Sequence, residues 1–289
     1  MNSNVKHILK KYLKYYKIRY RFSPQLWKKQ QMLTMHYQKL KKDDNLPHIQ
    51  DTGLKVFSQF EEDGMLLYIF SLLEMPTKSF IEFGSDDGIN SNSANLYYHH
   101  GFNGLFMDGN QKAIDRGNYF FNKRPNVTKK APVFKHAMIT AENINDLIES
   151  AGFSGEVGLL SIDIDGNDYW VWKAIQVVSP QVVIVETHNE FGLNDIIVPY
   201  DPSYFYPGVH PDYHGASPVA MTKLAKHKGY RLVGSNKLGF NFIYVREDLL
   251  KTELPEVTVE SLLTDPSNKE AQSRFEPIKN WKYITEDFA

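Results

Sequence analysis

The sequence predicts an α/β protein with a doubly wound, mostly parallel sheet that ends in an antiparallel hairpin and carries a basic helical arm at its N-terminus. Short apolar runs alternate with segments of helical period from residue 58 to residue 186, and such alternation forms a parallel sheet covered on both faces. Two further strand-like runs are joined by a short loop with Asn236 and Gly239, which is the pattern of a hairpin. The chain before residue 43 is basic and has a helical period.

The individual elements follow from these patterns in chain order. A helical segment is expected over residues 5–22 and a second over 26–40, before a polar break. Strands are expected at the apolar runs 79–83, 104–107, 133–138, 158–164 and 181–186, and in the hairpin at 230–234 and 240–245. Helices are expected over 61–73, 92–100, 143–151, 169–177 and 218–228. The chain thus divides into an arm (1–45), an α/β domain (46–250) and a C-terminal tail (251–289) packed on or beside that domain.

Composition narrows the function classes. Cysteine is absent, which excludes disulfides and thiolate chemistry within this sequence. No apolar run approaches the ~20 residues that span a bilayer, and the basic N-terminus lacks the apolar stretch of a signal peptide. We therefore expect a cytoplasmic protein.

The arm differs from the rest of the chain in charge. Residues 1–42 hold 12 Lys or Arg and no acid, which leaves 21 basic and 34 acidic side chains in the remainder. Residues 5–22 combine an apolar and aromatic stripe with a lysine face, as in helices that lie on an anionic membrane surface. The alternative is that the arm packs on its own domain or on a second subunit of a homo-oligomer. The acidic body does not suggest binding of nucleic acid.

A glycine turn after the first strand predicts a ligand site. The strand at 79–83 runs into Gly84-Ser85-Asp86-Asp87-Gly88, and ligands of open α/β sheets bind at this edge. The spacing is Gly-x-x-x-Gly, whereas a dinucleotide site needs Gly-x-Gly-x-x-Gly. Asp86 and Asp87 would repel a pyrophosphate and suit the ammonium and sulfonium of S-adenosylmethionine. A structural alternative is that Gly88 only turns the chain and that Asp87 only caps a helix.

The second strand ends in Asp108, where an acid can hold both hydroxyls of a ribose. With Glu82, at the end of the first strand, this acid defines the expected cofactor contacts. The full expected set is Gln59, Glu82, Gly84, Ser85, Asp86, Gly88, Asn92, Asp108, Gly109, Asn110, Met138 and Asp163.

Several motifs together resemble the FkbM-like S-adenosylmethionine-dependent methyltransferases. The resemblance covers about residues 55–248 and implies a class I methyltransferase domain of Rossmann-like fold, which ends in an antiparallel pair. It implies an O-methyltransferase acting on a sugar of a cell-surface polysaccharide, an O-antigen of lipopolysaccharide, or a lipid-linked glycan precursor. The matching motifs are Ser58-Gln59, Glu62-Asp63-Gly64, Glu82-Phe83-Gly84, Asp87-Gly88, Asp163-Ile164-Asp165-Gly166-Asn167-Asp168, Glu186, Gly215-Ala216-Ser217 and Gly229-Tyr230-Arg231-Leu232-Val233-Gly234. The chain departs from the family at Thr187-His188, where relatives often carry an aromatic residue followed by Asn.

Methyl transfer to a sugar hydroxyl requires positioning and a group that removes the proton. We expect His188, supported by Asp165, to be this base, because an imidazole titrates near neutral pH; His214 is the next candidate. A histidine that only fixes a loop is the alternative for His188, and helix capping is the alternative for Asp163 and Asp168. Mg²⁺ bound by Asp165 with Glu186 or His188 is a less favoured alternative, so no metal site is assigned.

The segment 200–214 (YDPSYFYPGVHPDYH) has neither a helical nor a strand period. Long loops beside a ligand site are usually functional, so we expect a lid that stacks aromatic rings on the acceptor sugar while Asp201, Asp212 and His214 reach its hydroxyls. The alternative is a surface loop that packs on its own aromatic rings.

Two other functions compete with this interpretation. The same sheet could serve an NAD-dependent sugar oxidoreductase, but the middle glycine and a Tyr-x-x-x-Lys pair are missing. The chain could also be a non-catalytic glycan-binding protein on a methyltransferase scaffold.

Overall fold

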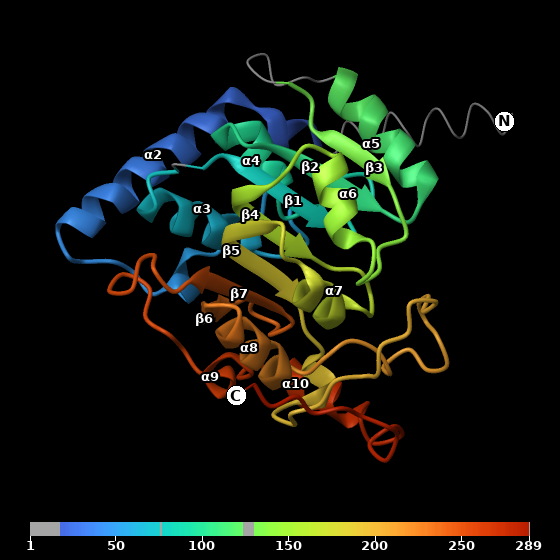
Figure 1. Cartoon of the computed structure of the whole chain (residues 1–289). Coiled ribbons are helices and arrows are strands. Elements are labelled where there is room, and N and C mark those ends of the chain that lie inside the picture. Colours follow the sequence, from blue (N-terminus) through green and yellow to red (C-terminus); the bar gives the residue numbers. More distant parts are fainter. Residues whose placement is uncertain (1–17, 76, 124–129, 289) are drawn as a thin grey trace, which may run out of the picture.

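The computed structural model describes residues 18–75, 77–123 and 130–288. Seven strands form one sheet in the order β3-β2-β1-β4-β5-β7-β6 (Figure 1). Strands β1 to β5 pair in parallel, and β7 is antiparallel to both β5 and β6. The strands are β1 (Ser79–Phe83), β2 (Asn103–Asp108), β3 (Val133–His136), β4 (Gly155–Ile162), β5 (Val178–Glu186), β6 (Tyr230–Ser235) and β7 (Asn241–Arg246). The predicted fold class, including the closing hairpin, is confirmed.

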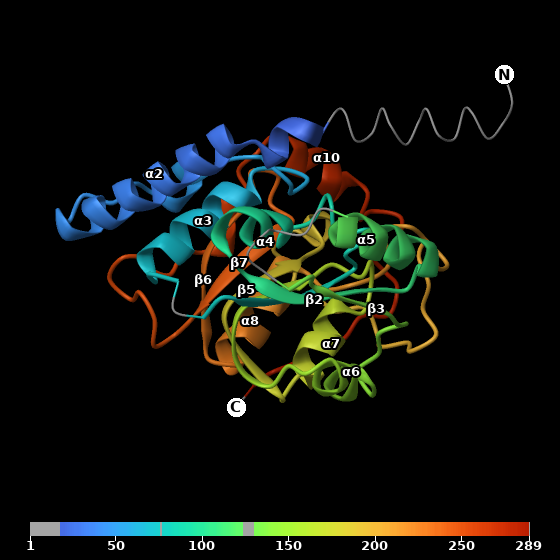
Figure 2. The same ribbon diagram turned by 90° about the horizontal axis from the view of Figure 1, so that it is seen from above.

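Helices cover both faces of this sheet, as a doubly wound fold requires. Figure 2 shows α3, α4 and α5 above the sheet, α2 outside them, and α6, α7 and α8 below it. The two largest clusters of buried apolar residues correspond to these two interfaces. The helices are α2 (Pro24–Lys42), α3 (Glu62–Leu72), α4 (Ala94–His100), α5 (Gln111–Lys123), α6 (Ile144–Ser150), α7 (Asp168–Ala174), α8 (Pro218–His227), α9 (Val259–Leu262) and α10 (Ser267–Ser273). Three short 3₁₀ helices are η1 (Arg19–Phe22), η2 (Ile49–Thr52) and η3 (Asn189–Phe191).

The structure adds helices that the sequence analysis did not predict: α5 within the α/β domain, and the short α9 and α10 in the C-terminal segment. Helix α5 buries Ala113, Ile114, Gly117, Phe120 and Phe121, which recur at helical spacing. These apolar side chains face the sheet and pack in the same cluster as Phe106 of β2. The pattern was present in the sequence, but a glycine in the middle of the segment is unfavourable in a helix and disguised it.

The N-terminal part of the chain is described only from Ile18 onward. Most of the helix expected over 5–22 therefore lies outside the described residues, and the described end is the 3₁₀ helix η1. Helix α2 packs closely on the domain: Gln30 is 1% exposed, and its side-chain amide exchanges hydrogen bonds of 3.1 and 2.9 Å with that of Asn95 in α4. Tyr37 lies edge-on to Tyr68 of α3 at 4.8 Å between ring centroids. Among the described residues, no helix combines the length and the apolar character needed to cross a membrane.

Candidate functional site

A cavity of about 1060 Å³ lies at the edge of the sheet where β1, β2, β4 and β5 end. We call it the edge cavity. The strand order reverses between β1 and β4, and this is the position where open α/β sheets bind ligands. Nine predicted site residues line it together: Gln59, Gly84, Asp86, Asp108, Gly109, Asn110, Met138, Asp163 and Asp165.

Gly84 lets the ends of β1 and β4 approach each other. Its φ of +69° is a left-handed conformation, and an added Cβ would lie 1.4 Å from the carbonyl oxygen of Asp163. No other residue fits both conditions. The glycine of the predicted motif thus closes the floor of the edge cavity by bringing the two strand ends into contact.

Asp108 organises the turn that faces the cavity. One carboxylate oxygen accepts from the backbone N–H of Asp86 at 2.8 Å, and the other accepts from the N–H of Asn110 at 2.7 Å. Each oxygen can accept more than one hydrogen bond. The carboxylate is therefore held at the end of β2 with capacity left for hydroxyl donors in the cavity.

The two acids of the glycine turn are neutralised in part by a cation from α5. Arg116 donates to the carboxylate of Asp86 at 2.9 Å, and its Nε lies 3.5 Å from a carboxylate oxygen of Asp87. Asp87 does not cap the following helix, because α4 begins at Ala94 with Ser93 as its N-cap. The sequence analysis overlooked Arg116 because it overlooked α5.

Four of the expected cofactor residues do not line the edge cavity: Glu82, Ser85, Gly88 and Asn92. The carboxylate of Glu82 accepts from the backbone N–H groups of Asn92 at 3.1 Å and Ser93 at 2.9 Å, so it positions the loop before α4. Burial raises the pKa of Glu82 to about 7, although these hydrogen bonds oppose the shift. A direct contact between Glu82 and the cofactor stays a prediction.

Three carboxyl groups meet where β4 and β5 end. Each of Asp163, Asp165 and Glu186 places an oxygen within 4.8 Å of the others. Burial, together with the neighbouring carboxylates, raises the pKa of Asp163 and Glu186, which are joined by a hydrogen bond between their carboxyl groups. A carboxyl pair of this kind holds one proton near neutral pH. Apart from the carboxyl of Asp163, the buried Oε2 atom of Glu186 has no hydrogen-bond partner among the described residues.

Asp168 closes the loop after β4 and does not cap α7. Its carboxylate accepts from the N–H groups of Ile164 and Gly166, both at 2.9 Å, while Asn167 occupies the N-cap position. The loop carries Asp165 with a φ of 53°. A buried carboxylate therefore fixes the conformation that presents Asp165 to the edge cavity.

His188 lies in a second, adjacent hollow of about 470 Å³, which we call the side hollow. Gln59, Glu186 and Phe240 line both spaces, so the two adjoin along a shared wall. The His188 ring packs on Gly215, where an added Cβ would lie 2.2 Å from its Cδ2. Its Nδ1 is 3.6 Å from a carboxylate oxygen of Glu190, and its Nε2 has no partner among the described residues.

His214, the last residue of the segment 200–214, is buried and lines neither space. Its ring is edge-on to that of His188 at 4.1 Å between centroids and stacks on Tyr204 at 5.8 Å. Burial, and the adjacent charge of His188, lower the pKa of His214 to about 3. Such an imidazole is a weak base, which makes His214 a poor substitute for His188.

The segment 200–214 is a loop, as expected. Tyr204, Phe205 and Tyr206 line the edge cavity, and the side chain of Phe205 is 74% exposed. The other residues expected to reach the acceptor have partners within the protein. Asp201 accepts from the N–H of Ser203, and Asp212 accepts from Arg274.

The C-terminal segment forms one side of the side hollow. Arg274, which follows α10, donates to the carboxylates of Glu190 and Asp212, the latter at 3.1 Å. Asn189 of η3 also donates to the side-chain oxygen of Asn268 at 2.8 Å. Burial would raise the pKa of Glu190, but its interactions with His188 and Arg274 outweigh burial and lower it to about 2. No sequence pattern indicated these contacts, because the partners of Arg274 lie 62 and 84 positions away.

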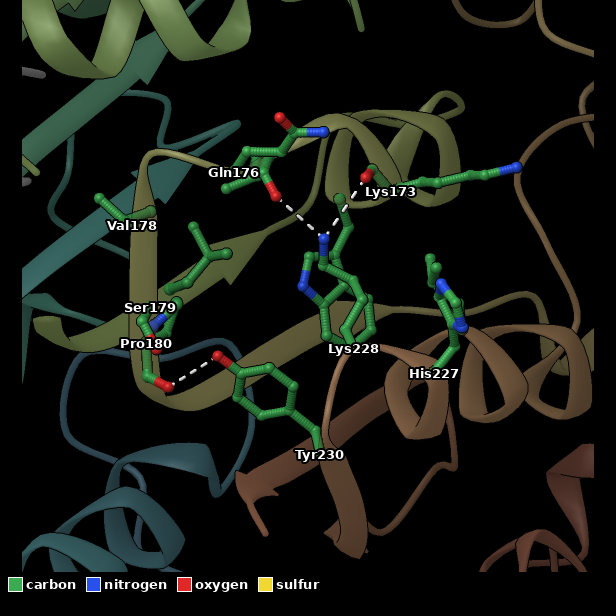
Figure 3. A pocket seen from close by; sticks show the side chains of 12 residues that line it. Lys173, Gln176, Val178, Ser179, Pro180, His227, Lys228 and Tyr230 are labelled. Carbon is green, nitrogen blue, oxygen red and sulfur yellow. Dashed lines mark hydrogen bonds between the residues drawn. The ribbon is translucent and has the colours of Figure 1, made fainter. Parts of the chain in front are cut away.

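A third cavity, of about 390 Å³, lies at the opposite edge of the sheet, where β5 begins (Figure 3). Lys228 points its ammonium into the end of α7 and donates to the carbonyls of Ile175 at 2.9 Å and Lys173 at 3.3 Å. Burial lowers the pKa of Lys228 to about 8. Tyr230 donates to the carbonyl of Pro180 at 2.8 Å (Figure 3). These groups satisfy the carbonyls of a helix end and a strand, which is a structural role.

Solved structures resemble this chain, whereas comparisons of its sequence find no match. No family model matches the chain, and no curated protein matches it. Among solved structures, the chain is similar to magnesium protoporphyrin IX methyltransferase (ChlM) from Synechocystis PCC 6803 with bound SAM, at 11% identity and a TM-score of 0.41. That likeness covers 64% of this chain and 77% of ChlM.

Two further solved structures are similar to the chain. The N-terminal domain of EvdMO1 with SAH bound shares 10% identity at a TM-score of 0.45, over 75% of this chain and 96% of that domain. The bifunctional kinase-methyltransferase WbdD shares 18% identity at a TM-score of 0.41, over 64% of this chain and 38% of the longer WbdD chain. The fold assignment rests on the sheet order itself and not on these likenesses.

Proposed function

We propose that this chain is an S-adenosylmethionine-dependent O-methyltransferase of the FkbM-like group that methylates a sugar hydroxyl. The observation that carries the proposal is the edge cavity. It lies at the point where the strand order reverses, and it collects eight of the expected cofactor residues from the ends of several strands and their loops. The motifs that resemble the family supply three of these residues, Gln59, Gly84 and Asp163, and the ends of β1 and β2 and the loops after β2 and β3 supply the others.

The charge of the edge cavity favours a cationic cofactor. Its lining includes Asp86, Asp108, Asp165 and the Asp163–Glu186 pair, whereas Lys112 is the only Lys or Arg among the described residues that line it. A pyrophosphate would meet like charges in this space, which argues against an NAD-dependent oxidoreductase. A sulfonium and an ammonium would meet opposite charges.

The described residues that line the edge cavity have side chains of the type that S-adenosylmethionine requires, at the positions where its ribose and adenine would lie. Asp108 is held by two backbone N–H groups and retains acceptor capacity for ribose hydroxyls. Met138 and Gly109 line the same space beyond the end of β2, where an adenine ring would find apolar contacts. When bound, the cofactor would supply a methyl group on a positively charged sulfur.

We assign removal of the acceptor proton to His188, supported by Asp165. The unpartnered Nε2 of His188 is the feature of the structure that supports this assignment. The charge of His188 and the carboxylate of Asp165 interact, because the imidazole opposes the rise in the pKa of Asp165 that burial causes. The aromatic rings of Tyr204, Phe205 and Tyr206 would cover the sugar from the loop side. The acceptor we propose is a cell-surface polysaccharide, an O-antigen or its lipid-linked precursor, methylated in the cytoplasm at the inner face of the membrane.

A magnesium ion is the alternative route to activating the hydroxyl. The structure brings Asp165 and Glu186 together with Asp163, but it does not bring His188 into this group. The donors are hard oxygens of the type that Mg²⁺ prefers. The hydrogen bond between Asp163 and Glu186 favours a shared proton over an ion, so the metal-free reaction remains our proposal.

Calorimetric titration separates the competing functions. The wild-type chain should bind S-adenosylmethionine and S-adenosylhomocysteine and show no heat with NAD⁺. Labelled methyl from S-adenosylmethionine should then appear on glycosides in a reaction that survives a chelator. Binding of NAD⁺ alone would establish the oxidoreductase, whereas binding of the cofactor or of a glycoside without transfer would favour a glycan-binding scaffold. Activity lost with EDTA and restored by Mg²⁺ would establish the metal route.

A further inference from the structure

The side hollow adjoins the edge cavity, and among its described lining residues only Gln59 belongs to the expected cofactor set. The wall between them includes Glu186, whose carboxyl group is hydrogen-bonded to that of Asp163. His188 lines the side hollow, is 8% exposed, and has a buried ring nitrogen, Nε2, without a partner among the described residues. A buried polar atom without a partner at this boundary indicates a place where a polar ligand completes the hydrogen bonding.

The lining of the side hollow combines an aromatic side with a polar side. Phe60 and Phe240 form an edge-to-face pair with ring centroids 5.3 Å apart. On the other side, Ser267, Glu270 and Arg274 line the hollow from one face of the C-terminal segment. A few polar groups set against apolar and aromatic surface are typical of small-molecule sites. A sugar ring has both an apolar face and a rim of hydroxyls and would match such a lining.

The charged side chains that line the side hollow restrict which kind of sugar ring it can bind. In the part of the chain that the structure describes, its carboxylates are Glu186, Glu190 and Glu270, and its one Lys or Arg is Arg274. That guanidinium already pairs with Glu190 and with Asp212. A carboxylate or phosphate on the ligand would therefore find no unpaired cation among the lining residues and would meet like charges.

We propose that the side hollow binds the acceptor as an uncharged or amine-bearing sugar ring, with its reactive hydroxyl at the wall formed by Glu186 and His188. This inference rests on the proposed function. The acceptor oxygen forms a bond to the methyl carbon while the carbon–sulfur bond breaks and its electron pair stays on sulfur. The hydroxyl proton passes to His188. The side hollow thereby explains how His188 meets the acceptor although it does not line the edge cavity.

Two separate experiments test this inference. The first changes the charge of the sugar that is added, and the second fills the side hollow with a large side chain. Methyl β-D-glucoside, methyl β-D-glucosaminide and methyl β-D-glucuronide, with their galacto counterparts, are added to the full chain saturated with S-adenosylhomocysteine. Saturation-transfer NMR measures binding. We expect the uncharged or amine-bearing glycosides to bind about tenfold more tightly than the uronides, because a uronide meets the acidic side chains of the hollow and no unpaired cation among its described lining residues.

Two variants of the same helix give the matched comparison. Glu270→Trp places a large side chain in the side hollow, whereas Lys269→Trp places it at an exposed position that does not line the hollow. Glycoside binding should be lost in E270W and kept in K269W, and both variants should bind S-adenosylmethionine as the wild type does.

Three outcomes would overturn the inference: unchanged glycoside binding in E270W, preferred binding of the uronides, or no glycoside binding by the wild-type chain. Loss of S-adenosylmethionine binding in the wild type is a separate result, which would reject the proposed function itself. Normal cofactor binding without glycoside binding rejects only the role given to the side hollow.

Discussion

At the scale of single residues, the edge cavity depends on a few side chains and one glycine that hold backbone in place. Gly84 allows contact between two strand ends, and Asp108 accepts from two N–H groups of adjoining turns. Glu82 and Asp168 do the same at the neighbouring loops. The acidic residues that the sequence analysis singled out thus form two groups. One group shapes the loops, and the other remains available to a ligand.

Asp108 belongs to the second group, and its replacement tests the cofactor assignment. We expect Asp108→Ala to lower affinity for S-adenosylmethionine about 10–100-fold, because charge-assisted hydrogen bonds contribute ~1.5–3 kcal/mol. Calorimetry gives the affinity, and Asp115→Ala on the exposed side of α5 is the control, since Asp115 does not line the edge cavity. An unchanged affinity in D108A would remove the ribose role from this residue.

His188 should matter for turnover and not for cofactor binding. We expect His188→Ala to lower kcat by ~10²–10⁴, the usual contribution of a general base, and to leave S-adenosylmethionine affinity within error. Methyl-transfer assays and calorimetry on the same preparation separate the two effects. If H188A turns over normally, the proton is taken by another group, and Glu186 at the shared wall becomes the first alternative.

The Asp163–Glu186 pair should make stability depend on pH. Both carboxyls have pKa values raised in the folded protein by burial, so the folded state binds more protons than the unfolded state above pH ~4. The free energy of unfolding therefore falls as pH rises through this window, by up to about 1.4 kcal/mol per pH unit for one proton. Urea denaturation at pH 5 and pH 8 should show a shallower fall in Glu186→Gln than in the wild type. An equal fall in both would mean that the pair does not retain a proton.

At the scale of elements, ion pairs join the C-terminal segment to the loop 200–214 and to η3 beside the side hollow. Arg274 contacts Asp212 of the loop and Glu190 of η3, while Phe275 lies edge-on to Phe191 at 5.5 Å between centroids. The sequence placed the tail on or beside the domain, and the structure shows it packed against the site.

Arg274→Ala should loosen these two elements without affecting the sheet. We expect faster hydrogen exchange in residues 200–214 and 267–273. Global stability should change by less than about 1 kcal/mol, because Arg274 is half exposed and solvent screens its ion pairs. Lys279→Ala removes another exposed cation of the same segment, paired with Glu276, and serves as the control. Exchange that accelerates equally in both variants would show that Arg274 has no special role.

At the scale of the whole molecule, charge separates the N-terminus from the body. The first 42 residues carry 12 cations and no acid, and the rest of the chain is strongly acidic. Helix α2 is nevertheless part of the folded body, since Gln30 and Tyr37 are buried against α4 and α3. A truncation that tests the predicted membrane arm should therefore keep the chain from Ile18 onward, so that α2 and its contacts remain.

We expect the full chain to sediment with anionic liposomes, and a chain beginning at Ile18 to sediment less. Each Lys or Arg near an anionic surface contributes ~1 kcal/mol, so the five lysines of residues 5–17 suffice for measurable binding. Binding should weaken with salt, because the Debye length falls from ~10 Å at 0.1 M to ~3 Å at 1 M. Neutral liposomes are the control. Equal sedimentation of both chains would reject the membrane role, and a change of oligomeric state on truncation would identify an assembly element.

The sequence by itself determined the fold class, the strand positions and nine of the residues that line the edge cavity. Those features are local: apolar periodicity marks strands and helices, and the residues after parallel strands meet at one edge of the sheet. This is why Gly84, Asp108 and Asp163 could be placed together before the structure was known. The longest helix that was missed, α5, carries a glycine in its middle, and the short helices α9 and α10 of the C-terminal segment were missed as well.

Only the tertiary structure decided which of these acids are available and where the acceptor would lie. The pairing of Arg116 with the glycine turn, the shared proton of Asp163 and Glu186, and the separation of His188 from the edge cavity all depend on contacts between distant segments. The side hollow is formed in part by Arg274, whose partners are remote in sequence. Such contacts leave no local pattern, because each is set by the packing of whole elements and not by the spacing of residues along the chain.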